Sequence, residues 1–141
     1  MDQESIVYGC IKDAAYTHDE YQHRDINRQA LLALPPATEW PLISREMFSI
    51  PKLKPGAGYY QTDVLHFGAS YKAIEYEWEQ WIVEFEALLR NMYWVSATVH
   101  LETELSGTHT FTWNSLTDSH QPGSQDIQIH CEWSQETALG L

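Results

Sequence analysis

The feature of this sequence that most constrains its fold is an apolar stripe between residues 71 and 92. Apolar side chains there recur at steps of three and four residues, which is the spacing of one face of an α-helix. The members of the stripe are Ile74, Trp78, Trp81, Ile82, Phe85, Leu88, Leu89 and Met92. Five glutamates, Glu75, Glu77, Glu79, Glu84 and Glu86, are distributed over the other faces. The pattern predicts a long amphipathic helix whose acidic side faces solvent.

Directly after this stripe the hydrophobic period changes to two, as in a strand with one apolar and one polar face. The apolar set is Tyr93, Val95, Ala97, Val99, Leu101, Thr103 and Leu105. The polar set is Trp94, Ser96, Thr98, His100, Glu102 and Glu104. Ser106 and Gly107 then provide a tight-turn signal, and 108–113 is rich in β-branched and aromatic residues. We expect a β-hairpin here.

Three further segments have the composition or the alternation of strands. They are 5–11, 59–67 and 126–133. Gly68, Ala69 and Ser70 are expected to turn the chain after the second of these segments, with Ser70 as the N-terminal cap of the long helix.

The remaining segments predict shorter helices and loops. A short helix is expected over 25–34, where Pro35 and Pro36 end it, and one or two helical turns over 38–48. Loops are expected at 16–24, 51–58 and 117–124, and a frayed tail at 134–141. Together the elements predict a single α+β domain over 1–141. Its antiparallel sheet of four to five strands has the long helix packed on the apolar face.

The charge of the chain indicates what kind of partner it favours. Asp and Glu number 20 against 8 Lys and Arg, so the formal net charge is −12. Because 43% of the residues are hydrophobic and 13% aromatic, the acids belong to a folded domain and not to a disordered tail. A strongly negative surface disfavours nucleic acid and anionic membranes and favours a basic protein. We expect a protein-binding module without a cofactor.

The sequence also bears on compartment and redox state. There is no apolar run near the ~20 residues of a membrane span, and the start of the chain is acidic, so a cytoplasmic location is expected. Cys10 and Cys131 match no metal or redox spacing. Two reduced thiols in the core are the favoured prediction, and a disulfide between the terminal strands is the alternative.

Two His-x-Glu pairs carry the main metal-binding signal, His100 with Glu102 and His130 with Glu132. On a strand each pair shares a face, so neighbouring strands would present two imidazoles and two carboxylates to a divalent ion. This arrangement would suit a small metal-dependent enzyme or a ligand-binding α+β barrel. The simpler interpretation is an ordinary polar sheet face with no metal.

The candidate partner-binding residues combine one aromatic side chain with polar and acidic neighbours. Trp94 lies on the polar side of its strand, where an exposed tryptophan is typical of an interface anchor. The alternative is that a loop or the second helix covers it. The complete set is Trp94, His100, Glu102 and Glu104 of the strand, and Glu75, Glu79 and Glu86 of the helix. A merely solvated acidic face is the simpler interpretation of the helix residues.

Part of the chain, 66–113, resembles small acidic bacterial proteins of the toxin-immunity type. The resemblance rests on Tyr76–Trp81, Tyr93–Ala97 and His100–Glu104. It implies a cytosolic antidote that occludes the active site of a cognate toxin and performs no chemistry of its own. A further alternative is a homo-oligomeric structural protein, such as a homodimer, with exposed aromatic side chains at the self-interface.

Overall fold

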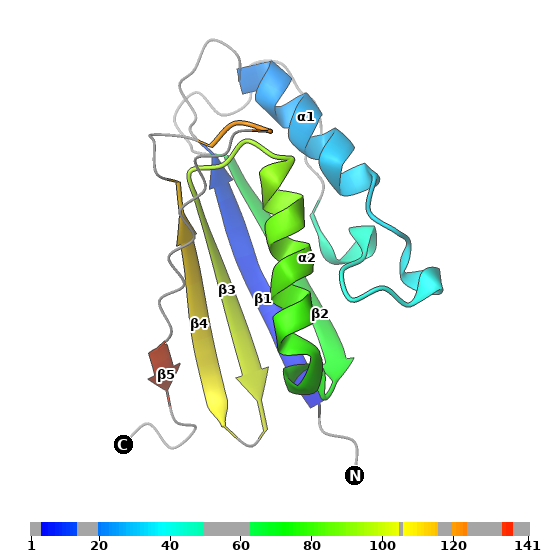
Figure 1. Cartoon of the computed structure of the whole chain (residues 1–141), viewed down its shortest axis with the longest axis vertical. Coiled ribbons are helices and arrows are strands. Elements are labelled where there is room, and N and C mark those ends of the chain that lie inside the picture. Colours follow the sequence, from blue (N-terminus) through cyan, green and yellow to red (C-terminus); the bar gives the residue numbers. More distant parts are fainter. Residues whose placement is uncertain are drawn as a thin grey trace.

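The computed structural model describes residues 4–13, 20–49, 63–104, 106–115, 120–123 and 134–136. They form an α+β fold in which helices cover one face of an antiparallel sheet (Figure 1). The strands are β1 (Glu4–Asp13), β2 (Asp63–Lys72), β3 (Ser96–Thr103), β4 (Gly107–Asn114) and the short β5 (Ser134–Glu136). Their order across the sheet is β2-β1-β3-β4-β5.

Two α-helices and three short 3-10 helices complete the described structure. The α-helices are α1 (Glu20–Leu32) and α2 (Trp78–Arg90). The 3-10 helices are η1 (Ala37–Glu39), η2 (Arg45–Met47) and η3 (Ile74–Glu77). The first two confirm the helical turns predicted over 38–48. In the described part of the chain, no helix has the length and apolar character needed to cross a membrane.

The core lies between α2 and the odd-numbered side chains of β1 to β4. Trp81 and Phe85 of α2 are fully buried, with ring centroids 5.1 Å apart, and Phe85 meets Trp113 of β4 at 5.1 Å. Each such aromatic ring buries a large apolar area and packs in a directional way against its neighbours. The apolar stripe of the sequence therefore contacts the sheet as predicted.

The boundary between β2 and the following helix differs from the prediction. Residues 68–70 do not form a turn, Ser70 caps no helix, and β2 continues to Lys72 because it pairs with β1 as far as the Glu4 and Lys72 positions. The chain turns at Ala73, whose φ is 52°, and η3 precedes α2. The pairing of Ser70 with Ile6 of β1, which is distant in the sequence, overrides the local cap signal.

Helix α1 begins at Glu20, so the loop predicted over 16–24 is wrong in its second half. Tertiary contacts account for the extra turn. Nδ1 of the buried His23 lies 3.0 Å from Asp13 Oδ2, and its ring stacks on Tyr93 at 3.7 Å. One turn later, Asn27 donates to the Tyr93 carbonyl and accepts from the Tyr93 amide. Because these contacts are polar, no apolar periodicity in the sequence predicts this first turn of the helix.

The hairpin of β3 and β4 is confirmed, with Thr103 opposite Gly107. The strand predicted over 126–133 lies outside the described residues, whereas 134–136, expected to be frayed, pairs with β4 as β5. Cys10 is a free thiol on the even-numbered face of β1 and is partly exposed. The prediction that it is a core residue is therefore wrong. Cys131 lies outside the described residues.

Candidate functional site

His100 and Glu102 share the face of β3 that α2 does not cover, as their spacing predicts. The His100 ring lies 4.9 Å from that of Tyr8, and its Nδ1 is 3.0 Å from Thr110 Oγ1. Glu102 accepts hydrogen bonds from the Tyr8 hydroxyl at 3.3 Å and from Thr108 at 3.4 Å. These contacts join β1, β3 and β4 in one polar network, which stabilises the sheet face and orients both side chains.

The predicted metal set involves four residues, of which the structure describes two. His130 and Glu132 lie outside the described residues. Within the described ranges, no group of three or more His, Cys, Asp or Glu side chains is placed to hold a metal ion. The metal-binding interpretation therefore stays a prediction.

Trp94 is not the exposed anchor that was expected. It is fully buried, its indole nitrogen donates to the Leu89 carbonyl at 2.8 Å, and its ring lies 5.2 Å from that of His120. The covering segment pairs with it through an isolated β-bridge between Trp94 and His120. The alternative of a covering loop is thus correct, and Trp94 is a core residue.

The predicted acidic residues have different surroundings. Glu79 and Glu104 are exposed, as expected for a docking surface. Glu75 accepts a hydrogen bond from the Ser5 hydroxyl at 2.5 Å, and Glu86 accepts one from the Trp113 indole at 3.1 Å. The half-buried Glu86 therefore has a structural role that the exposed helix face did not predict.

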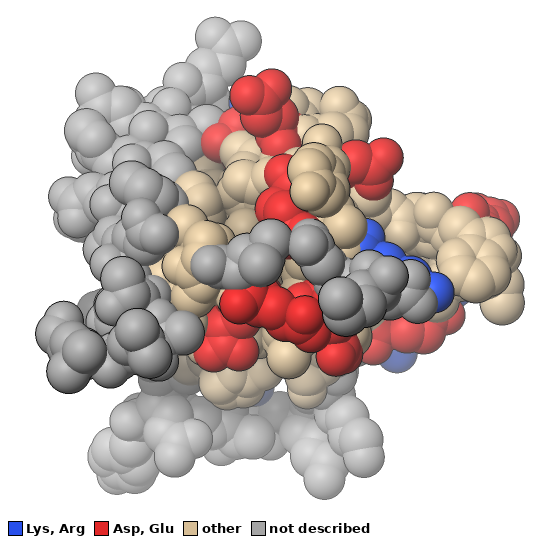
Figure 2. Space-filling model, turned by 90° about the horizontal axis from the view of Figure 1, so that it is seen from below, with Lys and Arg blue, Asp and Glu red and all other residues tan. Residues whose placement is uncertain are grey.

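Most of these acids gather at one end of the molecule. This is the end where β1 starts, β3 finishes, and η3 leads into α2, and Figure 2 shows acidic side chains crowded there. We define the acidic end as Glu4, Glu75, Glu77, Glu79, Glu102 and Glu104. The fold thus concentrates on one surface a charge that is scattered along the sequence.

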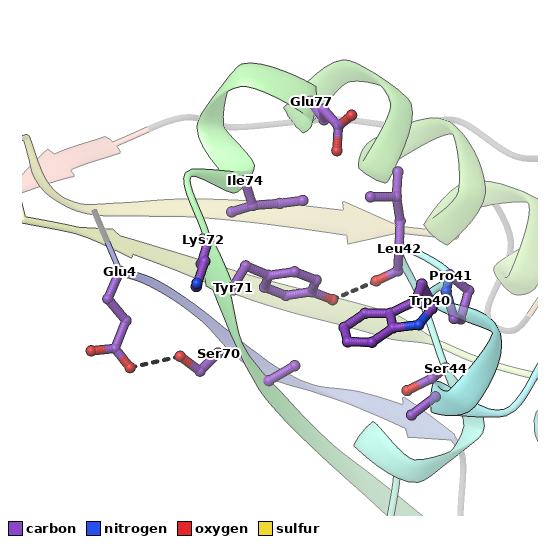
Figure 3. Close-up of a pocket in the computed structure, with 12 residues that line it drawn as sticks. Glu4, Trp40, Pro41, Leu42, Ser44, Ser70, Tyr71, Lys72, Ile74 and Glu77 are labelled. Carbon is purple, nitrogen blue, oxygen red and sulfur yellow. Dashed lines mark hydrogen bonds between the residues drawn. The ribbon is translucent and has the colours of Figure 1, made fainter. Parts of the chain in front are cut away.

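A pocket of about 820 Å³ opens beside the acidic end. We call it the Trp40 pocket. Residues 69–72 of β2 with Ile74 and Glu77 form one wall, and the loop residues Trp40, Pro41 and Leu42 form part of the other (Figure 3). Glu4 and Glu77 belong both to this pocket and to the acidic end, so the two features are continuous.

Hydrogen bonds hold the loop wall of the pocket in place. The Tyr71 hydroxyl donates to the Leu42 carbonyl at 2.5 Å and accepts from the Trp81 indole at 3.1 Å. The Ala37 amide donates to Glu46 at 2.9 Å, which closes the loop on itself. Burial raises the pKa of Tyr71 above its ordinary value, so the phenol stays neutral and able to donate.

Trp40 itself has two uncommon properties. Its side chain is 92% exposed, and its φ of 55° lies in the left-handed region, which is costly for a bulky residue. Within the described residues, the non-glycine positions with positive φ are Trp40, which lines this pocket, and Ala73, which lies between the lining residues Lys72 and Ile74. Strain of this kind persists where the surroundings enforce it, and it concentrates at functional sites.

Trp40 belongs to none of the periodic apolar patterns of the sequence. It lies in a short segment with Pro35, Pro36 and Pro41, where no apolar period would bury a tryptophan. That mismatch between a large aromatic residue and a loop composition is the signal that identifies it.

The chain matches no protein-family model, no curated protein and no solved structure.

Proposed function

We propose that this protein is a binding module for a basic protein and that the acidic end and the Trp40 pocket form its docking surface. The observation that carries the proposal is that a 92% exposed tryptophan adjoins a concentration of carboxylates. Aromatic anchors supply much of the binding energy at protein interfaces, and complementary charge speeds association and selects the partner.

The specific form of this proposal is a cytoplasmic immunity protein that occludes a bacterial toxin. It is supported by the resemblance of 66–113 to such proteins and by the net charge of −12, which suits a basic active site. In this form the module blocks the active site of the toxin sterically, and its negative charge complements the basic surface of that site.

The test is co-expression with the product of the adjacent gene, followed by co-purification and measurement of association rates. We expect the rate to fall steeply as the salt concentration rises from about 0.05 M to about 0.5 M, because the Debye length shrinks from about 14 Å to about 4 Å. A harmless neighbour that forms no complex at low salt would contradict the immunity form.

A matched pair of double variants distinguishes the effect of carboxylates at the acidic end from the effect of the total charge of the protein. Glu77→Gln with Glu79→Gln removes two exposed carboxylates of the acidic end. Asp25→Asn with Glu84→Gln removes the same charge from outside the acidic end, on α1 and α2. The first pair is expected to slow association clearly more than the second, and equal effects would count against this docking surface.

A further inference from the structure

The outer edge of β2 presents backbone groups that the sheet does not use. β2 lies at the end of the strand order, with β1 as its neighbour. Beside its first half, the Ser49 amide donates to the His66 carbonyl at 2.9 Å. Backbone groups alternate in direction along an antiparallel strand, so Ser70, four residues further on, also directs its amide and carbonyl outward. Within the described residues, no backbone hydrogen bond from another segment reaches the edge at Ser70.

The Trp40 pocket lies beside this part of the edge. Ala69, Ser70 and Tyr71 line it on the strand side, and Trp40 and Leu42 line it on the loop side (Figure 3). A volume of about 820 Å³ is enough for several side chains. Alternate side chains of an extended chain point to the same side, so a strand added at Ser70 would direct one set toward this pocket.

The charges around the pocket indicate the chemistry of the occupant. The carboxylates of Glu4 and Glu77 and the ammonium of Lys72 line it, within a chain whose net charge is −12. This field attracts lysine and arginine side chains. It repels nucleic acid and a second copy of the same acidic chain.

We propose that the edge of β2 at Ser70 and the Trp40 pocket bind an extended segment of the basic partner as an additional strand. This inference rests on the proposed function, because it states how the partner is held. The Ser70 backbone recognises the extended conformation, Trp40 and Leu42 pack against an apolar side chain, and Glu4 and Glu77 face lysine or arginine.

The first experiment uses a short capped peptide of alternating lysine and valine as the probe. Amide hydrogen exchange and NMR shifts are measured on the full chain with and without this peptide. We expect new protection at the Ser70 amide and little change at Ala69 and Tyr71, whose amides already face β1. A peptide with glutamate in place of lysine is the charge control and is expected not to bind.

Backbone methylation of the peptide gives the sharpest result. A bound strand turns one alternate set of its amides toward β2 and the other set away. N-methylation of the set facing β2 is expected to abolish binding, whereas methylation of the other set leaves it intact. Equal effects of the two methylated peptides, or no binding of the parent peptide at millimolar concentration, would overturn strand addition.

Variants of the protein extend the test to the natural partner. Ser70→Pro removes the outward amide at an edge position, where proline is tolerated, and Ser70→Ala keeps that amide. We expect Ser70→Pro to weaken binding about tenfold relative to Ser70→Ala, and Trp40→Ala to weaken it by about thirtyfold.

The outcomes separate the two proposals. If the partner binds but neither Ser70→Pro nor Trp40→Ala weakens it, strand addition is overturned and the proposed function stands. If the lysine peptide binds in one methylation register but the neighbouring gene product does not bind, the edge site stands and the proposed partner fails. Protection of the Ser70 amide by concentration-dependent self-association would assign the edge to a second copy and overturn the inference.

Discussion

The hydroxyl of Tyr71 donates a hydrogen bond to the carbonyl of Leu42 at 2.5 Å and thereby ties β2 to the loop that presents Trp40. The same oxygen accepts a hydrogen bond from the indole of Trp81 on α2. One phenol thus connects the sheet edge, the loop wall of the pocket and α2.

Replacement of Tyr71 by phenylalanine tests this connection. Tyr71→Phe leaves the Trp81 indole and the Leu42 carbonyl without this partner, which is expected to lower the free energy of unfolding by about 1–3 kcal/mol. Denaturant unfolding measures the loss, and partner binding is expected to weaken with it. Tyr76→Phe is the control, because Tyr76 is 79% exposed. Similar losses in the two variants would contradict the role given to Tyr71.

The ionisation of Tyr71 predicts a pH dependence. Burial, reinforced by the charge of Glu84 and partly offset by the Trp81 hydrogen bond, raises its pKa in the folded state above 10.0. The unfolded chain therefore loses this proton first. The contribution of the neutral Tyr71 phenol to the free energy of unfolding is complete below pH 10.0 and declines as the pH rises through the folded pKa. Denaturant unfolding of the wild type and of Tyr71→Phe is measured at neutral and alkaline pH. The free energy of unfolding is expected to decline less with rising pH in the variant.

Substitutions of Glu79 and Glu86 are predicted to differ in their effect on stability, although both residues belong to the acidic side of α2. Glu79 is exposed, so Glu79→Lys is expected to change stability by no more than about 0.5 kcal/mol. Glu86 accepts the Trp113 indole hydrogen bond, so Glu86→Lys is expected to cost about 1–3 kcal/mol. Equal melting behaviour of the two variants would show that the Trp113 contact contributes nothing.

Substitutions at Trp40 separate stability from binding. Glycine adopts a φ of 55° without strain, whereas alanine does not, so Trp40→Gly is expected to be more stable than Trp40→Ala by about 1 kcal/mol. Both variants lose the exposed indole and are expected to bind the partner poorly. Unfolding curves and binding measurements on the same preparations check both expectations. If both variants retain the affinity of the wild type for the partner, the assignment of Trp40 to the interface is wrong.

Two glycines of the sheet provide a matched test of the β1 packing. A Cβ at Gly9 would lie 2.0 Å from the Thr98 carbonyl oxygen, which backbone cannot accommodate without moving β3. At Gly68 the nearest atom is 3.6 Å away. Gly9→Ala is therefore expected to destabilise the protein by about 3 kcal/mol or more, and Gly68→Ala by less than about 1 kcal/mol. Thermal or denaturant unfolding measures both.

Local periodicity predicted the features that depend on neighbouring residues alone. The burial of Trp81, the exposure of Glu79, the hairpin and the shared face of His100 and Glu102 all follow from spacings of two to four residues. Ser70 was misassigned because its strand conformation depends on β1.

The Trp40 pocket was missed for a related reason. Leu42 and Tyr71, which hold its two walls together, are 29 residues apart, and no local pattern records their contact. Trp94 was misassigned because the segment at His120 covers it, again through a contact distant in sequence.

The position of β1 between β2 and β3 has a consequence for how the chain folds. β1 precedes both partners, and contacts such as Glu4 with Ser70 and Tyr8 with Glu102 close loops of 66 and 94 residues. Such distant pairings make folding slow relative to a helical protein of the same size. Until β2 is synthesised, the apolar residues Val7 and Ile11 belong to a strand with neither neighbour in place, and until β3 follows it has only one. During that interval the exposed apolar surface and unpaired edges of β1 make the incomplete chain prone to associate with other chains.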